Sequence, residues 1–135
     1  MIGLDTNVLV RYVVQDDPEQ AHAATRLIEG GCTTEEPAYI GAVVLAELAW
    51  VLRGPYGYRR TQVAAVLRQV LRTVEFVVEE PTVAWAALAE FESSSADFAD
   101  CWIGHSNRAR GCESTYTFDF KASRVAHFEL VDGER

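Results

Sequence analysis

Short apolar runs alternate with helix-like segments along the whole chain, and this alternation constrains the fold more than any other feature. The expected strands cover residues 1–4, 38–40, 75–78, 115–118 and 128–131. The expected helices cover residues 6–14, 18–29, 42–54, 59–72, 82–92 and 98–110. Strands that are separated by helices predict an α/β fold with a mostly parallel central sheet and helices on both of its faces, which is a three-layer sandwich.

The length and composition predict one domain over residues 1–135. A chain of 135 residues with 49% hydrophobic residues can build one ordinary core and is too short for two comfortable ones. The sequence shows no internal repeat, linker or low-complexity segment. The segment 42–52 is apolar on nearly all sides, which predicts a buried helix, and residues 1–4 predict a buried strand.

Four acidic residues lie in segments that otherwise favour the apolar interior. Asp5 closes MIGLD, Glu47 interrupts AVVLAELAWVL, Asp100 lies within DFADCWIG and Asp119 closes TYTFD. Removing one carboxylate from water costs several kcal/mol unless it is paired. Four such residues therefore suggest a shared divalent cation, which prefers oxygen ligands.

Two of these acids are expected at the same edge of the sheet. Asp5 and Asp119 each end a predicted strand, and ligands of open α/β sheets bind beyond the carboxyl ends of the strands. Thr6 and Asn7 follow Asp5 directly, and Thr117 precedes Asp119 by two residues, so it faces the same side of the strand. We expect these three residues to support the carboxylates, a bound water or the substrate.

Each acid also has a structural interpretation. Asp5 can cap the following helix, Glu47 can lie on a solvated helix face, and Asp119 can form an Asx-turn. Asp97 and Asp100 fit the first and last positions of a helix capping box. We favour ligand roles for Asp5, Glu47, Asp100 and Asp119, and keep Asp97 as an auxiliary acid or a helix cap.

Charge, cysteines and hydropathy narrow the class of protein. The formal net charge of −8 disfavours nonspecific nucleic-acid binding through a basic surface, although cations held by the acids would reverse the local field. The three cysteines, Cys32, Cys101 and Cys112, form no CxxC pair and support neither a disulfide framework nor a zinc ribbon. No apolar run approaches the length of about 20 residues that crosses a membrane. We therefore expect a cytoplasmic protein without a membrane anchor.

Four segments in this order resemble the PIN-domain family, in particular the VapC-like toxins of bacterial toxin and antitoxin pairs. The segments are MIGLDTNVLV, LAELAWVLR, DFADCWIG with its downstream RARG, and TYTFDFKASR. The likeness runs from Met1 almost to Val131. Ser106 and Asn107 depart from the family's pattern, because small apolar residues are common at their positions.

The resemblance implies a small, cytoplasmic, Mg²⁺- or Mn²⁺-dependent ribonuclease with an α/β/α fold. It assigns the family's four acids to Asp5, Glu47, Asp100 and Asp119, which would hold one or two ions. It also implies a homodimer and a small antitoxin protein whose C-terminal segment blocks the acidic residues.

Two other functions compete with RNA hydrolysis. An Asp after the first strand also begins receiver and haloacid-dehalogenase-like phospho-acceptor domains. However, the sequence DTN lacks the second Asp of a DxD motif, and Glu47 would have no role there. The second alternative is a noncatalytic interaction module in which the metal is structural and the apolar helices bind a partner.

Overall fold

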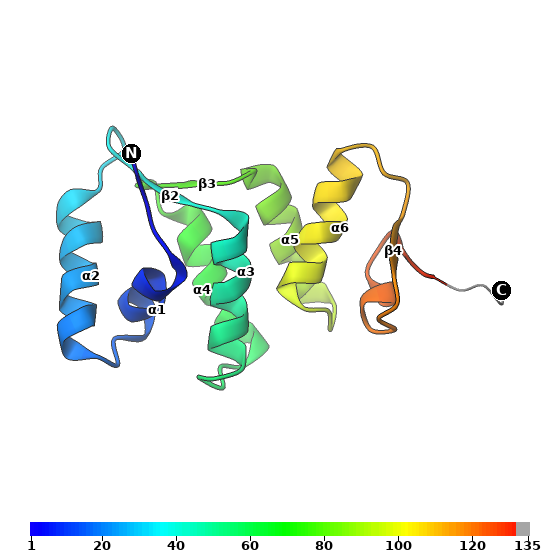
Figure 1. The fold of residues 1–135 in the computed structure, drawn as a ribbon, viewed down its shortest axis with the longest axis horizontal. Helices are drawn as coiled ribbons and strands as arrows, with labels where there is room; N and C mark the ends of the chain where they lie inside the picture. The colour runs from blue at the N-terminus through cyan, green and yellow to red at the C-terminus, as the bar shows by residue number, and fades with distance from the viewer. Residues whose placement is uncertain (132–135) are drawn as a thin grey trace. The chain divides into compact units, whose positions relative to one another are not determined.

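The computed structural model describes residues 1–131, which fall into two compact units, Met1–Glu80 and the residues from Pro81 onward. Both units combine helices with parallel strands, which confirms the predicted α/β class (Figure 1). The expectation of one domain over residues 1–135 stays a prediction. No helix within residues 1–131 is both long enough and apolar enough to cross a bilayer.

The first unit is built from three parallel strands and four helices. Its elements in chain order are β1 (Ile2–Gly3), α1 (Thr6–Val14), α2 (Pro18–Gly31), β2 (Ala38–Ile40), α3 (Ala42–Arg53), α4 (Arg60–Arg72) and β3 (Phe76–Val78). The strand order is β1-β2-β3, with Ile2 opposite Ala38 and Ala38 opposite Phe76. The helices supply the crossovers that parallel pairing requires. Leu9, Ile40, Leu45, Leu48 and Leu67 are fully buried in the core.

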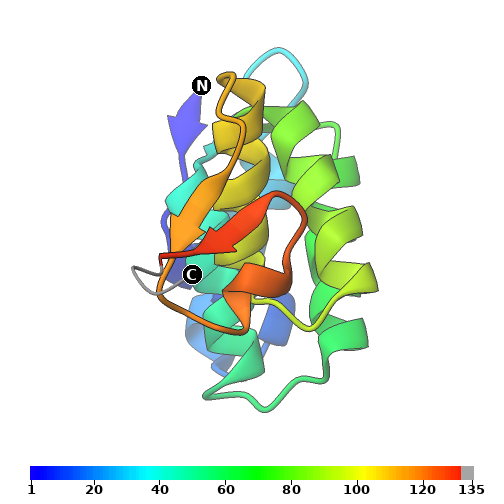
Figure 2. The same cartoon turned by 90° about the vertical axis from the view of Figure 1, so that its right-hand side faces the viewer.

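The second unit pairs two helices with two parallel strands. Its elements are α5 (Pro81–Ser93), α6 (Phe98–Ala109), β4 (Thr115–Thr117), the 3₁₀ helix η1 (Ala122–Arg124) and β5 (Phe128–Leu130). Strands β4 and β5, orange and red in Figure 2, pair with Thr115 opposite Phe128. The parallel strands of residues 1–131 therefore lie in two hydrogen-bonded sheets, one in each unit.

Gly104 allows β5 to lie close against α6 in the second unit. A Cβ atom added at Gly104 would lie 2.5 Å from Cε1 of the buried Phe128 ring, well inside van der Waals contact. The Phe91 ring of α5 and the Phe98 ring of α6 meet edge to face with centroids 6.2 Å apart. The missing side chain of Gly104 thus sets how closely the β4–β5 pair approaches α6.

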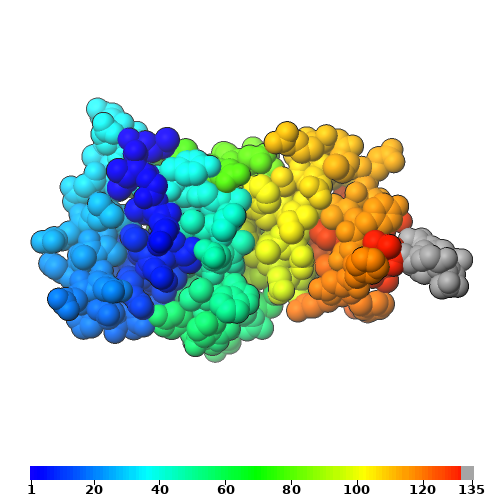
Figure 3. Space-filling model, in the orientation of Figure 1, coloured from blue at the N-terminus to red at the C-terminus, as the bar shows by residue number. Residues whose placement is uncertain are grey.

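Two burial predictions are wrong. Strand β1 is an edge strand with exposed residues, and the first residues of the chain lie open on the face seen in Figure 3. Helix α3 is amphipathic rather than buried on all sides, because Val43 and Trp50 are 72% and 69% exposed. Only the opposite stripe of α3, which includes Leu45, Leu48 and Leu52, fills the core.

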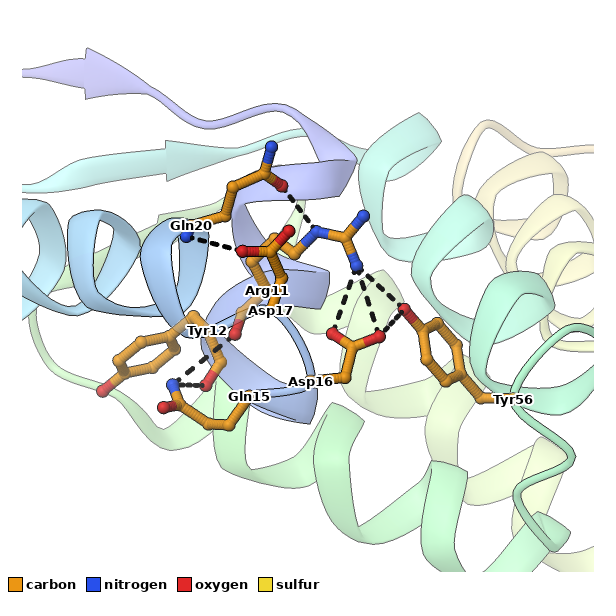
Figure 4. Close-up of polar contacts among 7 residues, drawn as sticks. All are labelled: Arg11, Tyr12, Gln15, Asp16, Asp17, Gln20 and Tyr56. Carbon is orange, nitrogen blue, oxygen red and sulfur yellow. Dashed lines mark hydrogen bonds and ion pairs between the residues drawn. The ribbon is translucent and has the colours of Figure 1, made fainter.

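A polar network ties the C-terminal end of α1 to the turn after α3 (Figure 4). Nη1 of Arg11 donates to Oδ1 of Asp16 at 3.2 Å and to the Tyr56 hydroxyl at 3.0 Å. The Tyr56 hydroxyl donates in turn to Oδ2 of Asp16 at 2.8 Å, and this bond lowers the pKa of Asp16 below its ordinary value. The network holds the C-terminal end of α1 in place. The N-terminal end of the same helix is capped by Asp5.

Candidate metal centre

Asp5 lies at the corner between β1 and α1 and caps the helix. Its backbone is extended, with φ −91° and ψ 172°, and its Oδ1 accepts a hydrogen bond from the Asn7 backbone N–H at 3.0 Å. Asn7 thus acts here through its backbone. The carboxylate is exposed, and the cap does not use its Oδ2 atom. The capping interpretation and the ligand interpretation of Asp5 are therefore compatible.

Glu47 is joined to the same corner by Thr6. The Thr6 hydroxyl donates to Oε1 of Glu47 at 2.5 Å, although the two residues are 41 positions apart. Glu47 lies in helix α3. The N-cap residue of α3 is Gly41, which has no side chain that could cap the helix. Instead, Oε1 of Glu79 accepts a hydrogen bond from the Ala42 backbone N–H at 2.9 Å. The structure therefore brings Asp5, Thr6 and Glu47 into one region of the first unit.

Asp100 lies within electrostatic reach of Asp97 and Asp119 in the second unit. Asp97 is the N-cap residue of α6 but makes no side-chain capping bond, and Asp100 lies in the first turn, half-buried. Burial is the main cause that raises the pKa of Asp100, and the negative charges of Asp97 and Asp119 raise it further. Lys121 partly offsets this effect. These three carboxylates thus form a region of unfavourable negative charge in the metal-free protein.

Asp119 is held by an Asx-turn after β4. Its Oδ1 accepts hydrogen bonds from the backbone N–H groups of Lys121 at 2.9 Å and Ala122 at 3.4 Å. Its own N–H donates to the Thr117 hydroxyl at 3.0 Å. Thr117 therefore supports the backbone of Asp119, and the turn leaves Oδ2 of the exposed carboxylate unused.

A family model for the PIN domain matches residues 2–128. The chain belongs to the PIN-domain family. A search of curated proteins and a search of solved structures returned no match. PIN domains are generally Mg²⁺- or Mn²⁺-dependent nucleases. The matched range includes both regions of acidic residues.

The donor chemistry of this PIN domain fits a hard divalent cation. The four candidate ligands are all carboxylates, which Mg²⁺ and Mn²⁺ prefer. Burial raises the pKa of Asp100 most and the nearby negative charges raise it further, and a bound cation would counteract both effects by favouring the charged carboxylate. Within each unit, as far as residue 131, no three His, Cys, Asp or Glu side chains gather into a complete ion-binding cluster. The four-residue ligand set therefore remains a proposal.

The first prediction for this PIN domain concerns the hydroxyl of Thr6. Thr6→Val keeps the shape of the side chain but removes the hydrogen bond that orients Glu47. Loss of such a supporting contact commonly lowers metal affinity or activity by about 10- to 100-fold. We expect that reduction in nuclease activity at limiting Mg²⁺, whereas Thr6→Ser keeps a hydroxyl and should retain activity. Equal activity of the Val and Ser variants would refute the role of the hydroxyl.

The second prediction concerns the metal-free stability of the domain. Because the pKa of Asp100 is raised above its ordinary value of 3.8, the folded state binds the Asp100 proton more tightly than the unfolded state. This contribution to stability is complete below about pH 3.8 and is lost as the pH rises through the folded-state pKa. The neutral Asp100→Asn variant should therefore have a higher Tm than the wild type at pH 7 in chelator, with a smaller difference near pH 4. A wild type that is the more stable protein at pH 7 would contradict the expectation.

Some features of the site have no signal in the sequence. The contact between Thr6 and Glu47 joins residues from two helices, so spacing along the chain does not indicate it. The capping of α3 by Glu79 has one indirect signal, because Gly41 cannot cap the helix itself. Lys121 follows Asp119 closely, but its effect on Asp100 depends on the turn between β4 and η1.

Proposed function

We propose that this PIN domain is a cytoplasmic, metal-dependent endoribonuclease, the toxin of a toxin-antitoxin pair that hydrolyses RNA phosphodiester bonds. The observation that carries the proposal is the family match over residues 2–128, a range that includes Asp5, Glu47, Asp100 and Asp119. The match does not favour a phospho-acceptor domain or a noncatalytic module.

In this proposal, Asp5, Asp100 and Asp119 bind one or two Mg²⁺ or Mn²⁺ ions. Bound ions supply a water with a lowered pKa and neutralise charge that develops on the phosphate. Glu47 is either a further ligand or the base that orients the attacking water, and Thr6 holds its carboxylate through the 2.5 Å hydrogen bond. The backbone N–H groups after Asp5 and Asp119 hold those two carboxylates in place. Asp97, Asn7 and Thr117 are auxiliary residues.

We also propose two protein partners, a second copy of the chain and a small antitoxin. The net charge of −8 supports a basic partner, and an antitoxin Arg placed among the carboxylates would replace the cation's charge. Light scattering of the isolated protein should give the mass of a dimer. Co-expression with the product of the adjacent gene should yield a stable complex without ribonuclease activity. A monomeric protein that forms no complex with the product of the adjacent gene would refute both proposed partners.

Cleavage of RNA in the presence and absence of metal tests the central proposal. The purified domain should cut RNA in Mg²⁺ or Mn²⁺, lose that activity in chelator and regain it when the metal is restored. Mapping of RNA ends across the transcriptome after brief expression, with Asp100→Asn as the control, would identify the cleavage site. A folded protein that binds metal but cuts no RNA would favour the noncatalytic module.

A further inference from the structure

Three exposed aromatic residues lie close to Asp119 in the sequence. Tyr116, Phe118 and Phe120 are 63%, 84% and 65% exposed, and Phe118 is the most exposed large hydrophobic side chain within residues 1–131. Fully burying a Phe side chain stabilises a protein by about 1.5–3 kcal/mol relative to leaving it exposed. Exposed aromatic residues next to a candidate catalytic acid therefore suggest a ligand-binding surface.

The local backbone holds these rings outward. In β4 the side chains alternate, so Tyr116 is exposed whereas Thr117 is half-buried. After the strand, the Asx-turn of Asp119 fixes the chain, and the buried Ala122 and Val125 anchor the segment that follows. Phe118 and Phe120 are thus exposed residues of an anchored turn, directly before and directly after Asp119 in the chain.

Two cations accompany the rings. The guanidinium carbon of Arg124 lies 5.4 Å from the centroid of the Phe120 ring, a cation–π contact. Lys121 is exposed and follows Phe120 directly. In a chain with a net charge of −8, positive side chains beside exposed aromatic rings match a ligand that has both flat apolar faces and negative charge. Single-stranded nucleic acid has both, because its unpaired bases stack on aromatic rings while cations contact its phosphates.

We propose that Phe118 and Phe120 stack against unpaired bases of a single-stranded substrate, on either side of the phosphate presented to Asp119. Lys121 and Arg124 contact the neighbouring phosphates. A duplex would not suit this surface, because its base faces are already stacked within the helix. The inference rests on the proposed nuclease function and adds the residues that position the substrate.

Binding to labelled oligonucleotides tests the inference. In an Asp100→Asn background, which should slow cleavage strongly, fluorescence anisotropy would measure the Kd for single-stranded RNA with and without Phe118→Ala, Phe118→Leu or Phe120→Ala. Loss of one stacked base should weaken binding by about 5- to 150-fold. Phe118→Leu should lose most of this affinity, because it keeps an apolar side chain but no aromatic face. The matched control is Val74→Ala, a change at a residue that is 69% exposed in the first unit, and it should leave the Kd unchanged.

An oligonucleotide with abasic positions provides a readout that a merely structural role would not affect. The parent protein should bind the abasic strand more weakly than the normal strand. This difference should be smaller in Phe118→Ala, which keeps the Phe120 ring, and absent in the double variant Phe118→Ala/Phe120→Ala. Equal affinity of Phe118→Ala and its parent for the normal strand would overturn the inference, while RNA cleavage by the wild type would still support the nuclease proposal. Binding of duplex RNA as tightly as single-stranded RNA would also overturn the inference. So would the loss of dimers in Phe118→Ala, because the ring would then belong to a dimer interface. A wild type that neither binds nor cuts RNA would refute both proposals.

Discussion

Asp5→Asn and Asp100→Asn are each expected to lower kcat/KM for RNA cleavage by at least about 100-fold, which corresponds to roughly 2.7 kcal/mol of lost transition-state stabilisation. The reason is the loss of an anionic oxygen ligand, because an amide oxygen carries no charge to hold the divalent ion. Steady-state cleavage of a defined RNA at saturating Mg²⁺ would measure the effect. Wild-type activity in folded Asp5→Asn protein would refute the proposed ligand role.

The choice of Asn separates catalysis from folding at Asp5. Asn is as good an N-cap residue as Asp, so the capping bond to the Asn7 N–H can survive the substitution. Ala would also remove the cap, at a typical stability loss of about 1 kcal/mol. Asp17 offers a matched control, because it caps α2 through the same kind of bond, to the Gln20 N–H at 3.0 Å. Asp17→Asn should leave both Tm and cleavage unchanged.

Gly104→Ala is expected to destabilise the protein by about 1–2 kcal/mol. The added methyl group would overlap the edge of the buried Phe128 ring, and overpacking a core typically costs about 1–3 kcal/mol. The higher helix propensity of Ala returns up to about 1 kcal/mol of that loss. For a chain of this size the Tm should fall by about 3–8 °C, measured by circular dichroism or calorimetry.

Gly30→Ala is the matched control for this substitution. Gly30 also lies within a helix, α2, but an added Cβ atom there would meet nothing within 4 Å. Its substitution should leave the Tm unchanged or raise it slightly. Phe128→Leu in the Gly104→Ala background should recover part of the lost stability, because the smaller side chain makes room. A Tm of Gly104→Ala equal to that of the wild type would show that the ring moves aside at no cost.

Local signals in the sequence predicted most of the fold. The bounds of α1 and β2 agree with the prediction, because Asp5 starts the helix and Gly41 follows the strand. Helix α2 instead continues through Gly30 and Gly31, where the Cys32 N–H still bonds to the Ile28 carbonyl. The exposure of β1 and of one face of α3 was mispredicted, because an apolar pattern does not reveal which positions a neighbouring element covers.

The sequence also predicted the kinds of residue in the candidate site, but not their contacts. Its apolar surroundings identified Glu47 as unusual, yet the structure leaves that side chain exposed and paired with Thr6. The close approach of Gly104 and Phe128 had no sequence signal, because it depends on how β5 lies against α6. Contacts between residues far apart in the chain are set by packing, which no local pattern encodes.

The capped carboxylates of Asp5 and Asp119 have a consequence for ion selection. In the proposed site, the Oδ1 atom of each carboxylate accepts hydrogen bonds from backbone N–H groups, so the Oδ2 atom would be the freer of the two to bind a cation. Ca²⁺ favours about six to eight oxygens and often takes both from one carboxylate, whereas Mg²⁺ keeps strict octahedral geometry and retains several waters. If Asp5 and Asp119 bind the ion as proposed, the hydrogen bonds that begin the helix and close the turn would favour Mg²⁺ over Ca²⁺.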